Sequence, residues 1–178
     1  DGDLAEAAQL SLGSLAPRAG AQGAAEIAGF LEQRLAGADG EERLEVLAAM
    51  GNAGRPENAA SILASLASDD AAERRAALSA TRHLAGNEVD EALALVVETD
   101  DSIELRTRAL ELLARRTTSG AASAVEGALE SHESAVRKAA VLALSSAARR
   151  DESLADRLRA LAASDPSEEV RSAARSVH

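Results

Sequence analysis

The sequence predicts an all-α protein, a right-handed α-solenoid of about five helical hairpins preceded by one leading helix. Composition is the first reason, because about a quarter of the 178 residues are Ala and aromatic residues make up 1%. Ala, Leu, Glu and Arg favour helices, whereas sheets are rich in β-branched and aromatic residues. The second reason is an arginine that recurs every 31–34 residues. An internal period of this length is typical of stacked helical hairpins.

The recurring arginine follows an apolar residue and is expected to open the second helix, helix B, of each hairpin. Val170-Arg171, Val136-Arg137 and Leu105-Arg106 are the clear copies, and each Arg is followed by Ala three residues later. Arg74 and Arg43 mark two weaker copies. We call Arg43, Arg74, Arg106, Arg137 and Arg171 the ladder arginines.

A second signal keeps the same phase. A short apolar helix, helix A, precedes each ladder arginine and ends in Leu or Val 8–10 residues before it, at Leu35, Leu66, Val97, Leu129 and Leu161. In four of the five copies another apolar residue stands four positions earlier, so that each pair shares one helical face. Acidic turns separate A from B, and glycines at 51, 54, 86 and 120 are expected to end the B helices.

The pattern predicts eleven helices in order along the chain: 3–15, 23–36, 41–51, 56–67, 71–85, 88–98, 102–117, 120–130, 134–148, 152–163 and 167–177. The first of them has no A partner, so we expect the chain to be a piece of a longer solenoid. No linker or low-complexity segment interrupts it. Residues 1–178 are therefore predicted to form one solenoid domain.

An arginine in the first turn of a helix lies near the positive end of the helix dipole, which is unfavourable unless something offsets it. The expected offset is an acid of the A–B turn, with Asp70, Asp101 and Glu133 as candidates, or the equivalent turn acid of the adjoining hairpin. Two roles remain open for this row of charges. It either joins neighbouring hairpins structurally or binds a partner.

The segment Glu133-Ser-Ala-Val136-Arg137-Lys-Ala-Ala140-Val-Leu-Ala143-Leu144 resembles the HEAT repeat, and five such units cover residues 23–178. The resemblance implies a helical-repeat scaffold that binds another protein, with the B helices lining the binding side. The outward positions of those helices are expected to include Arg75, Ser79, Arg82, Arg108, Glu111, Lys138, Val141 and Ser145. The charged residues among them form the candidate partner surface: Arg75, Arg82, Arg108, Glu111 and Lys138.

Residues 8–85 also resemble the helical domain of the vitellogenin family of large lipid transfer proteins. The likeness rests on Leu44–Met50 followed by Gly51-Asn52-Ala53-Gly54-Arg55-Pro56, and on Leu12-Gly13-Ser14-Leu15 upstream. It implies a lipid-transport-related or secreted ancestor. Lipid would be bound only if the parent protein has further β-rich domains, because this chain has no lipid-enclosing sheet.

Charge and residue content narrow the function. Residues 1–100 hold 18 acids and 7 bases, and residues 101–178 hold 12 of each, so that the net charge of −11 argues against nucleic acid as a partner. There is no Cys, the three His are scattered, and no apolar run is long enough to span a bilayer. We therefore expect no metal, no cofactor and no catalytic residue. A non-enzymatic scaffold for protein–protein interaction is the leading hypothesis, with a vitellogenin-like lipid transport domain and a HEAT-like lyase-type enzyme subunit as alternatives.

Overall fold

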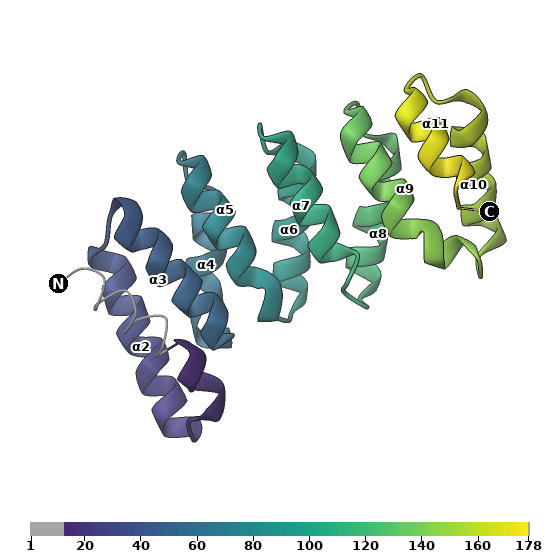
Figure 1. Cartoon of the computed structure of the whole chain (residues 1–178). Coiled ribbons are helices and arrows are strands. Elements are labelled where there is room, and N and C mark those ends of the chain that lie inside the picture. Colours follow the sequence, from purple (N-terminus) through teal and green to yellow (C-terminus); the bar gives the residue numbers. More distant parts are fainter. Residues whose placement is uncertain (1–12, 178) are drawn as a thin grey trace. The chain divides into compact units, whose positions relative to one another are not determined.

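The computed structural model describes residues 13–177 of the chain (Figure 1). It divides the chain into two compact units, Asp1–Val89 and Asp90–His178, and each is described by itself below. No β-strand occurs among residues 13–177, as the composition predicts. Every predicted helix from 23–36 onward is present, whereas residues 3–12 of the predicted leading helix lie outside the described part.

The first unit contains two hairpins. A helical turn at 13–15 and the 3₁₀ helix η1 (Ala16–Arg18) precede α2 (Ala21–Gly37), which pairs with α3 (Gly40–Ala53). The second hairpin begins with η2 (Pro56–Asn58), which continues into α4 (Ala59–Ser65). It returns through α5 (Ala71–Ala80), whose last turn tightens into η3 (Thr81–His83). The two B helices, α3 and α5, pack against each other along their length.

The second unit contains three hairpins, and its first helix, α6 (Asn87–Thr99), carries the boundary between the units. After α6 come α7 (Ile103–Leu113), α8 (Ser119–Gly127) with η4 (Ala128–Glu130), and α9 (Ser134–Ala148). The last hairpin is α10 (Glu152–Ser164) and α11 (Glu168–Arg175). The B helices pack in chain order, α7 on α9 and α9 on α11.

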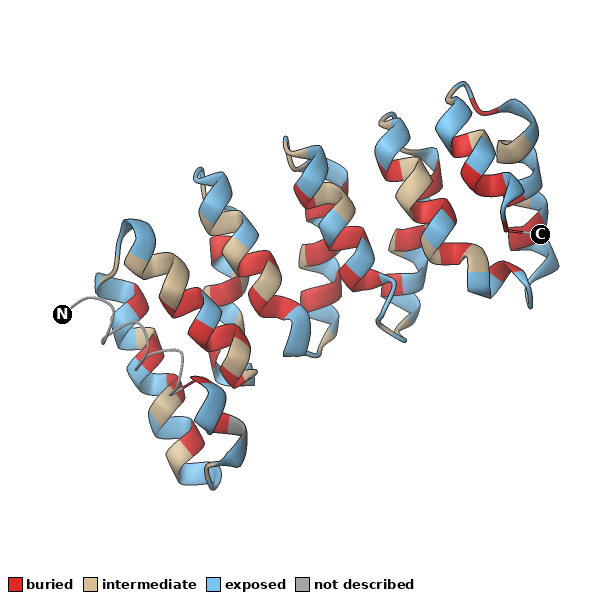
Figure 2. Ribbon diagram, viewed as in Figure 1, coloured by how far each residue is buried: buried red, intermediate tan, exposed pale blue. Residues whose placement is uncertain are grey.

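The core of each unit is a row of aliphatic side chains on the faces where neighbouring helices meet (Figure 2). The position four residues after a ladder arginine is buried in four repeats, at Leu47, Leu78, Leu110 and Val141. Val141 was expected to point outward, and that expectation is wrong: Val141 is 0% exposed and the next residue, Leu142, is 53% exposed. The position three residues after the arginine is equally buried, and Ala140 is 0% exposed.

Two of the glycines predicted to end B helices have another role. Gly51 lies inside α3, and a Cβ added there would stand 2.6 Å from the Cα of Ala80 in α5, so that close helix contact requires glycine. Gly120 lies in the first turn of α8 and ends nothing. The helix predicted at 41–51 ends later than expected, because α3 continues to Ala53. Gly54 caps it in the left-handed conformation with φ 58°.

Candidate functional site

All five ladder arginines donate a hydrogen bond to a backbone carbonyl at the end of helix A or in the A–B turn of their own hairpin. The donor–acceptor pairs are Arg43 to Leu35, Arg74 to Ser68, Arg106 to Val97, Arg137 to Ser131 and Arg171 to Asp165. The last carbonyls of a helix lack partners within it and form its negative end. The C-terminal end of helix A therefore supplies part of the electrostatic compensation that an arginine at the start of helix B requires.

The residue six positions before a ladder arginine shapes the A–B turn in four repeats. Its side-chain oxygen accepts a hydrogen bond from the N–H two residues later, an arrangement that Asp, Asn, Ser and Thr favour at turns. The pairs are Ser68 with Asp70 N, Asp100 with Ser102 N, Ser131 with Glu133 N, and Asp165 with Ser167 N. We call Ser68, Asp100, Ser131 and Asp165 the turn acceptors.

In the second unit, Arg137 also reaches the turn acceptor of the following hairpin. Its Nε and Nη2 each donate to one oxygen of Asp165 over 2.8 Å, while Nη1 donates to the carbonyls of Ser131 and His132. The side chains of Arg137 and Asp165 are 12% and 2% exposed. The hydrogen bonds from Arg137 hold the pKa of the Asp165 carboxyl below its usual value, and those bonds also raise the pKa of Arg137.

The first unit contains a related contact. Arg43 donates from Nε to Oε1 of Glu73 over 2.6 Å, and the other carboxylate oxygen of Glu73 accepts from the hydroxyl of Ser68 over 2.8 Å. Burial alone would raise the pKa of Glu73, but the hydrogen bonds from Arg43, Ser68 and Ser65 outweigh it and lower that pKa. A ladder arginine here also joins its own hairpin to the next one along the chain.

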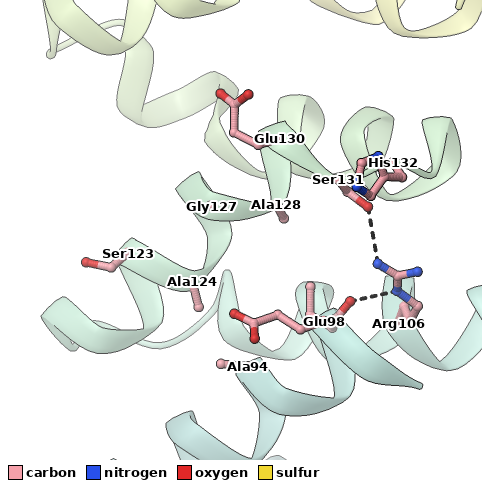
Figure 3. A pocket seen from close by; sticks show the side chains of 11 residues that line it. Ala94, Glu98, Arg106, Ser123, Ala124, Gly127, Ala128, Glu130, Ser131 and His132 are labelled. Carbon is pink, nitrogen blue, oxygen red and sulfur yellow. Dashed lines mark hydrogen bonds between the residues drawn. The ribbon is translucent and has the colours of Figure 1, made fainter.

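Arg106 is different because the turn acceptor that it reaches is neutral. Its Nε donates to the carbonyl of Val97 over 2.7 Å and its Nη2 to Oγ of Ser131 over 3.2 Å (Figure 3). No Asp or Glu among residues 13–177 forms an ion pair with it, and its Nη1 makes no hydrogen bond to a described residue.

A pocket of about 280 Å³ lies beside Arg106, between α6, α7 and the α8–η4 segment. Most of the side chains that line it are small. Its polar groups come from Arg106 and Ser131 and from Glu98, Ser123, Glu130 and His132 (Figure 3). The lining residues are Ala94, Val97, Glu98, Arg106, Ser123, Ala124, Gly127, Ala128, Glu130, Ser131 and His132.

Two of the three acids named as candidate offsets, Asp70 and Glu133, stand at helix N-caps. Asp70 caps α5, where its carboxylate accepts from Ala72 N over 2.8 Å. Asp101 is exposed in the turn before α7. Glu133 stands at the N-cap of α9 and adds only a minor favourable charge to Arg137. The carboxylate that binds Arg137 is Asp165. For this arginine the offset therefore comes from the turn of the adjoining hairpin and not from an acid of its own turn.

Another buried acid was not singled out from the sequence. Asp90 in α6 is 3% exposed, accepts from Nε of Arg116 through one oxygen, and accepts from the hydroxyl of Thr118 through the other. Thr118 is also the N-cap of α8, where it accepts from Ala121 N. The cluster joins the start of α6 to the α7–α8 turn, at the end of the hairpins away from the ladder. Nothing in the spacing of the sequence pairs a residue with another 26–28 positions later.

In the candidate partner surface, Arg75, Arg82, Arg108 and Glu111 are exposed and Lys138 is part-exposed. Several of its charges are paired within their unit. Arg82 donates to Asn52, Arg108 pairs with Glu111 over 2.7 Å, and Lys138 pairs with Glu169 over 2.9 Å. Their role in binding stays a prediction.

A family model for HEAT repeats matches residues 89–177, which is half of the chain. The chain belongs to the HEAT-repeat family. The matched residues hold the three hairpins of the second unit, in which Arg106, Arg137 and Arg171 have the geometry described above. The fold class predicted from the sequence, an all-α solenoid of HEAT hairpins, is thereby confirmed.

Among solved structures, the HEAT chain is similar to the crystal structure of an engineered protein that was a target of the Northeast Structural Genomics Consortium. The match has a TM-score of 0.53 and 19% identity, and it covers 99% of this chain and 90% of the other. At this identity the likeness shows the fold alone. No curated protein matches the chain.

The resemblance of residues 8–85 to the vitellogenin family finds no support in these matches. The glycines that carry it have a local explanation, since Gly51 admits the close approach of α5 and Gly54 caps α3. Within residues 13–177, no group of three or more His, Asp or Glu is placed to hold a metal ion. No helix in that range is long and apolar enough to cross a membrane.

Proposed function

We propose that this HEAT protein is a non-enzymatic scaffold that binds a protein partner through the exposed side of its B helices. The observation that carries the proposal is Leu142, which stands in the middle of α9 and is 53% exposed, whereas its neighbour Val141 is buried. A large aliphatic side chain in the open is informative when it borders a hollow lined by polar groups.

Leu142 borders such a hollow. A shallow pocket of about 480 Å³ lies between α9 and α11, lined by Lys138, Leu142, Glu168, Glu169, Ser172, Ala173 and Ser176. The ion pair between Lys138 and Glu169 crosses from one B helix to the next beside it. An apolar centre with a rim of charges of both signs is the usual anatomy of a protein–protein contact.

The ladder is assigned a structural role in this proposal. Its arginines donate to carbonyls of their own hairpins, and Arg137 has its charge matched by a buried carboxylate. An arginine held as Arg137 is has few free donors for a partner. The partner surface is therefore the row of exposed B-helix residues, centred on Leu142.

Site-specific photocrosslinking tests the proposal. Benzoylphenylalanine is placed at position 142 of the full chain, and at position 160 as a control, because Ala160 is exposed on α10. Each protein is irradiated in extract of the source cells. We expect one discrete adduct from position 142, none from position 160, and competition by the wild-type chain but not by Leu142→Glu. Equal adducts from both positions, or equal competition by Leu142→Glu, would overturn the proposal.

A further inference from the structure

The repeats of the second unit differ at one position that decides how a ladder arginine is neutralised. The turn acceptor that faces Arg137 is Asp165, and the one that faces Arg106 is Ser131. Both turn acceptors stand six residues before the next ladder arginine, and both accept the N–H two residues later. They are equivalent positions in the turn, one occupied by a carboxylate and the other by a hydroxyl.

A hydroxyl neither balances the charge of a guanidinium nor accepts two parallel hydrogen bonds from it. Arg106 consequently keeps an unused donor at Nη1 and has no acidic partner among residues 13–177. The space beside it is the pocket of about 280 Å³, and Arg106 and Ser131 both line that pocket (Figure 3).

The unused donor of Arg106 can donate to a carboxylate, and the walls of the pocket indicate which groups would stand next to that carboxylate in a ligand. Alanines and Gly127 give room and apolar contact for the methylene groups of a side chain. Glu98 and Glu130 line the same pocket from α6 and from η4, and both are exposed. Glu130 also accepts from Arg157 of α10 over 3.5 Å, an ion pair that leaves the Glu130 side chain 81% exposed. A free anion would be repelled by these two acids. In a peptide whose carboxylate is flanked by basic groups, the carboxylate would be attracted to Arg106 and the bases to Glu98 and Glu130.

We propose that the Arg106 pocket binds an acidic side chain of a peptide in which basic residues stand on either side of the acid. The bound carboxylate accepts from the guanidinium of Arg106, as Asp165 does from Arg137, and the flanking bases lie near Glu98 and Glu130. The site is at the A–B turns and does not use the B-helix face around Leu142. It therefore stands or fails independently of the proposed function.

The test is a titration of the ¹⁵N-labelled full chain followed through its arginine Nε–H signals, with Arg106→Lys used to assign the signal of Arg106. The probes are acetyl-Lys-Asp-Lys-amide, its Asn counterpart, sodium acetate and inorganic phosphate, at equal ionic strength. We expect the Asp peptide to shift the Arg106 signal saturably. The Asn peptide, acetate and phosphate should each bind at least tenfold more weakly.

Ser131→Asp supplies the missing carboxylate from within the chain. We expect this variant to lose affinity for the Asp peptide at least tenfold and to melt at a higher temperature than the wild type. Ser146→Asp adds the same charge on an exposed part of α9 outside the pocket, and should bind as the wild type does.

Several outcomes would overturn the inference. Equal binding of the Asn peptide shows that the carboxylate is not recognised. Equal binding of acetate shows that the flanking bases are irrelevant, and equal binding of phosphate shows a general anion site. A folded Ser131→Asp protein with unchanged peptide affinity places the binding elsewhere. If that variant does not fold, retention of binding by folded Arg106→Gln, followed through the backbone amide signals of the pocket residues, also places the binding elsewhere.

Discussion

Arg137 donates two hydrogen bonds of 2.8 Å to the carboxylate of Asp165, which lies 28 residues further along the chain in the turn of the next hairpin. The same guanidinium donates to two carbonyls of its own turn. One side chain therefore joins two consecutive HEAT hairpins, in a fold where each unit is stabilised mainly by its neighbours.

Removing Arg137 should destabilise the second unit strongly. Arg137→Ala leaves the buried carboxylate of Asp165 without the guanidinium that balances its charge, which costs about 3 kcal/mol. Arg137→Lys keeps the charge but loses the paired geometry, at a cost of about 1.5 kcal/mol, the value of one hydrogen bond to a charged group. Urea unfolding followed by circular dichroism measures both.

Arg149→Ala is the control for that series, since Arg149 is exposed at the end of α9 and bonds only Ser146 among the described residues. It should change stability by no more than about 0.5 kcal/mol. If Arg137→Ala and Arg149→Ala unfold at the same urea concentration, the ladder is not structural and a partner-binding role becomes the better interpretation.

Stability should depend on pH through Asp165. Its pKa is lower in the folded chain than in the unfolded one, where it is about 3.9. The stabilisation is therefore fully present above the unfolded value and is lost as pH falls through the folded value. The difference in unfolding free energy between wild type and Asp165→Asn should be constant from about pH 5 to 7 and should shrink below about pH 4. A difference that stays the same down to about pH 2.5 would show that the carboxylate charge contributes nothing.

Ala140 and Lys138 test the orientation of α9. Ala140 is 0% exposed, so Ala140→Phe overpacks the contact between helices and should cost about 1–3 kcal/mol or more. Lys138 has only a part-exposed ion pair with the exposed Glu169, and Lys138→Ala should change stability by about 0.5 kcal/mol or less. Melting temperatures measured by calorimetry distinguish the two. Equal melting temperatures for the two variants would mean that Ala140 does not lie on the buried face of α9.

Gly51 and Gly29 form a matched pair of helical glycines in the first unit. A Cβ at Gly51 would stand 2.6 Å from Cα of Ala80, whereas nothing lies within 4 Å of one at Gly29. Gly51→Ala should therefore destabilise by about 1–3 kcal/mol, because a backbone neighbour must move. Gly29→Ala should stabilise by up to about 1 kcal/mol, the difference in helix propensity. The opposite order of melting temperatures would refute the close contact of α3 and α5.

The proportion of Ala, the recurrence of the ladder arginines and the paired apolar residues were sufficient to predict the helices, their order and the α-solenoid. These are local features, because helix propensity and the 3.6-residue period act over neighbouring residues. The same period placed Ala140 correctly in the core. It misplaced Val141, because the width of the buried stripe depends on how closely the next helix packs against α9.

Only the tertiary structure decided which groups neutralise the arginines. The sequence shows that the charge at the start of each B helix needs an offset. It does not show that carbonyls of helix A provide part of it, or that Asp165 and Ser131 are equivalent partners from the next hairpin. Asp90 with Arg116 and Thr118 was hidden for the same reason. Contacts between residues about 25 to 30 positions apart depend on how one hairpin is laid against the next, and a period in the sequence gives the spacing of the hairpins but not the side chains that meet between them.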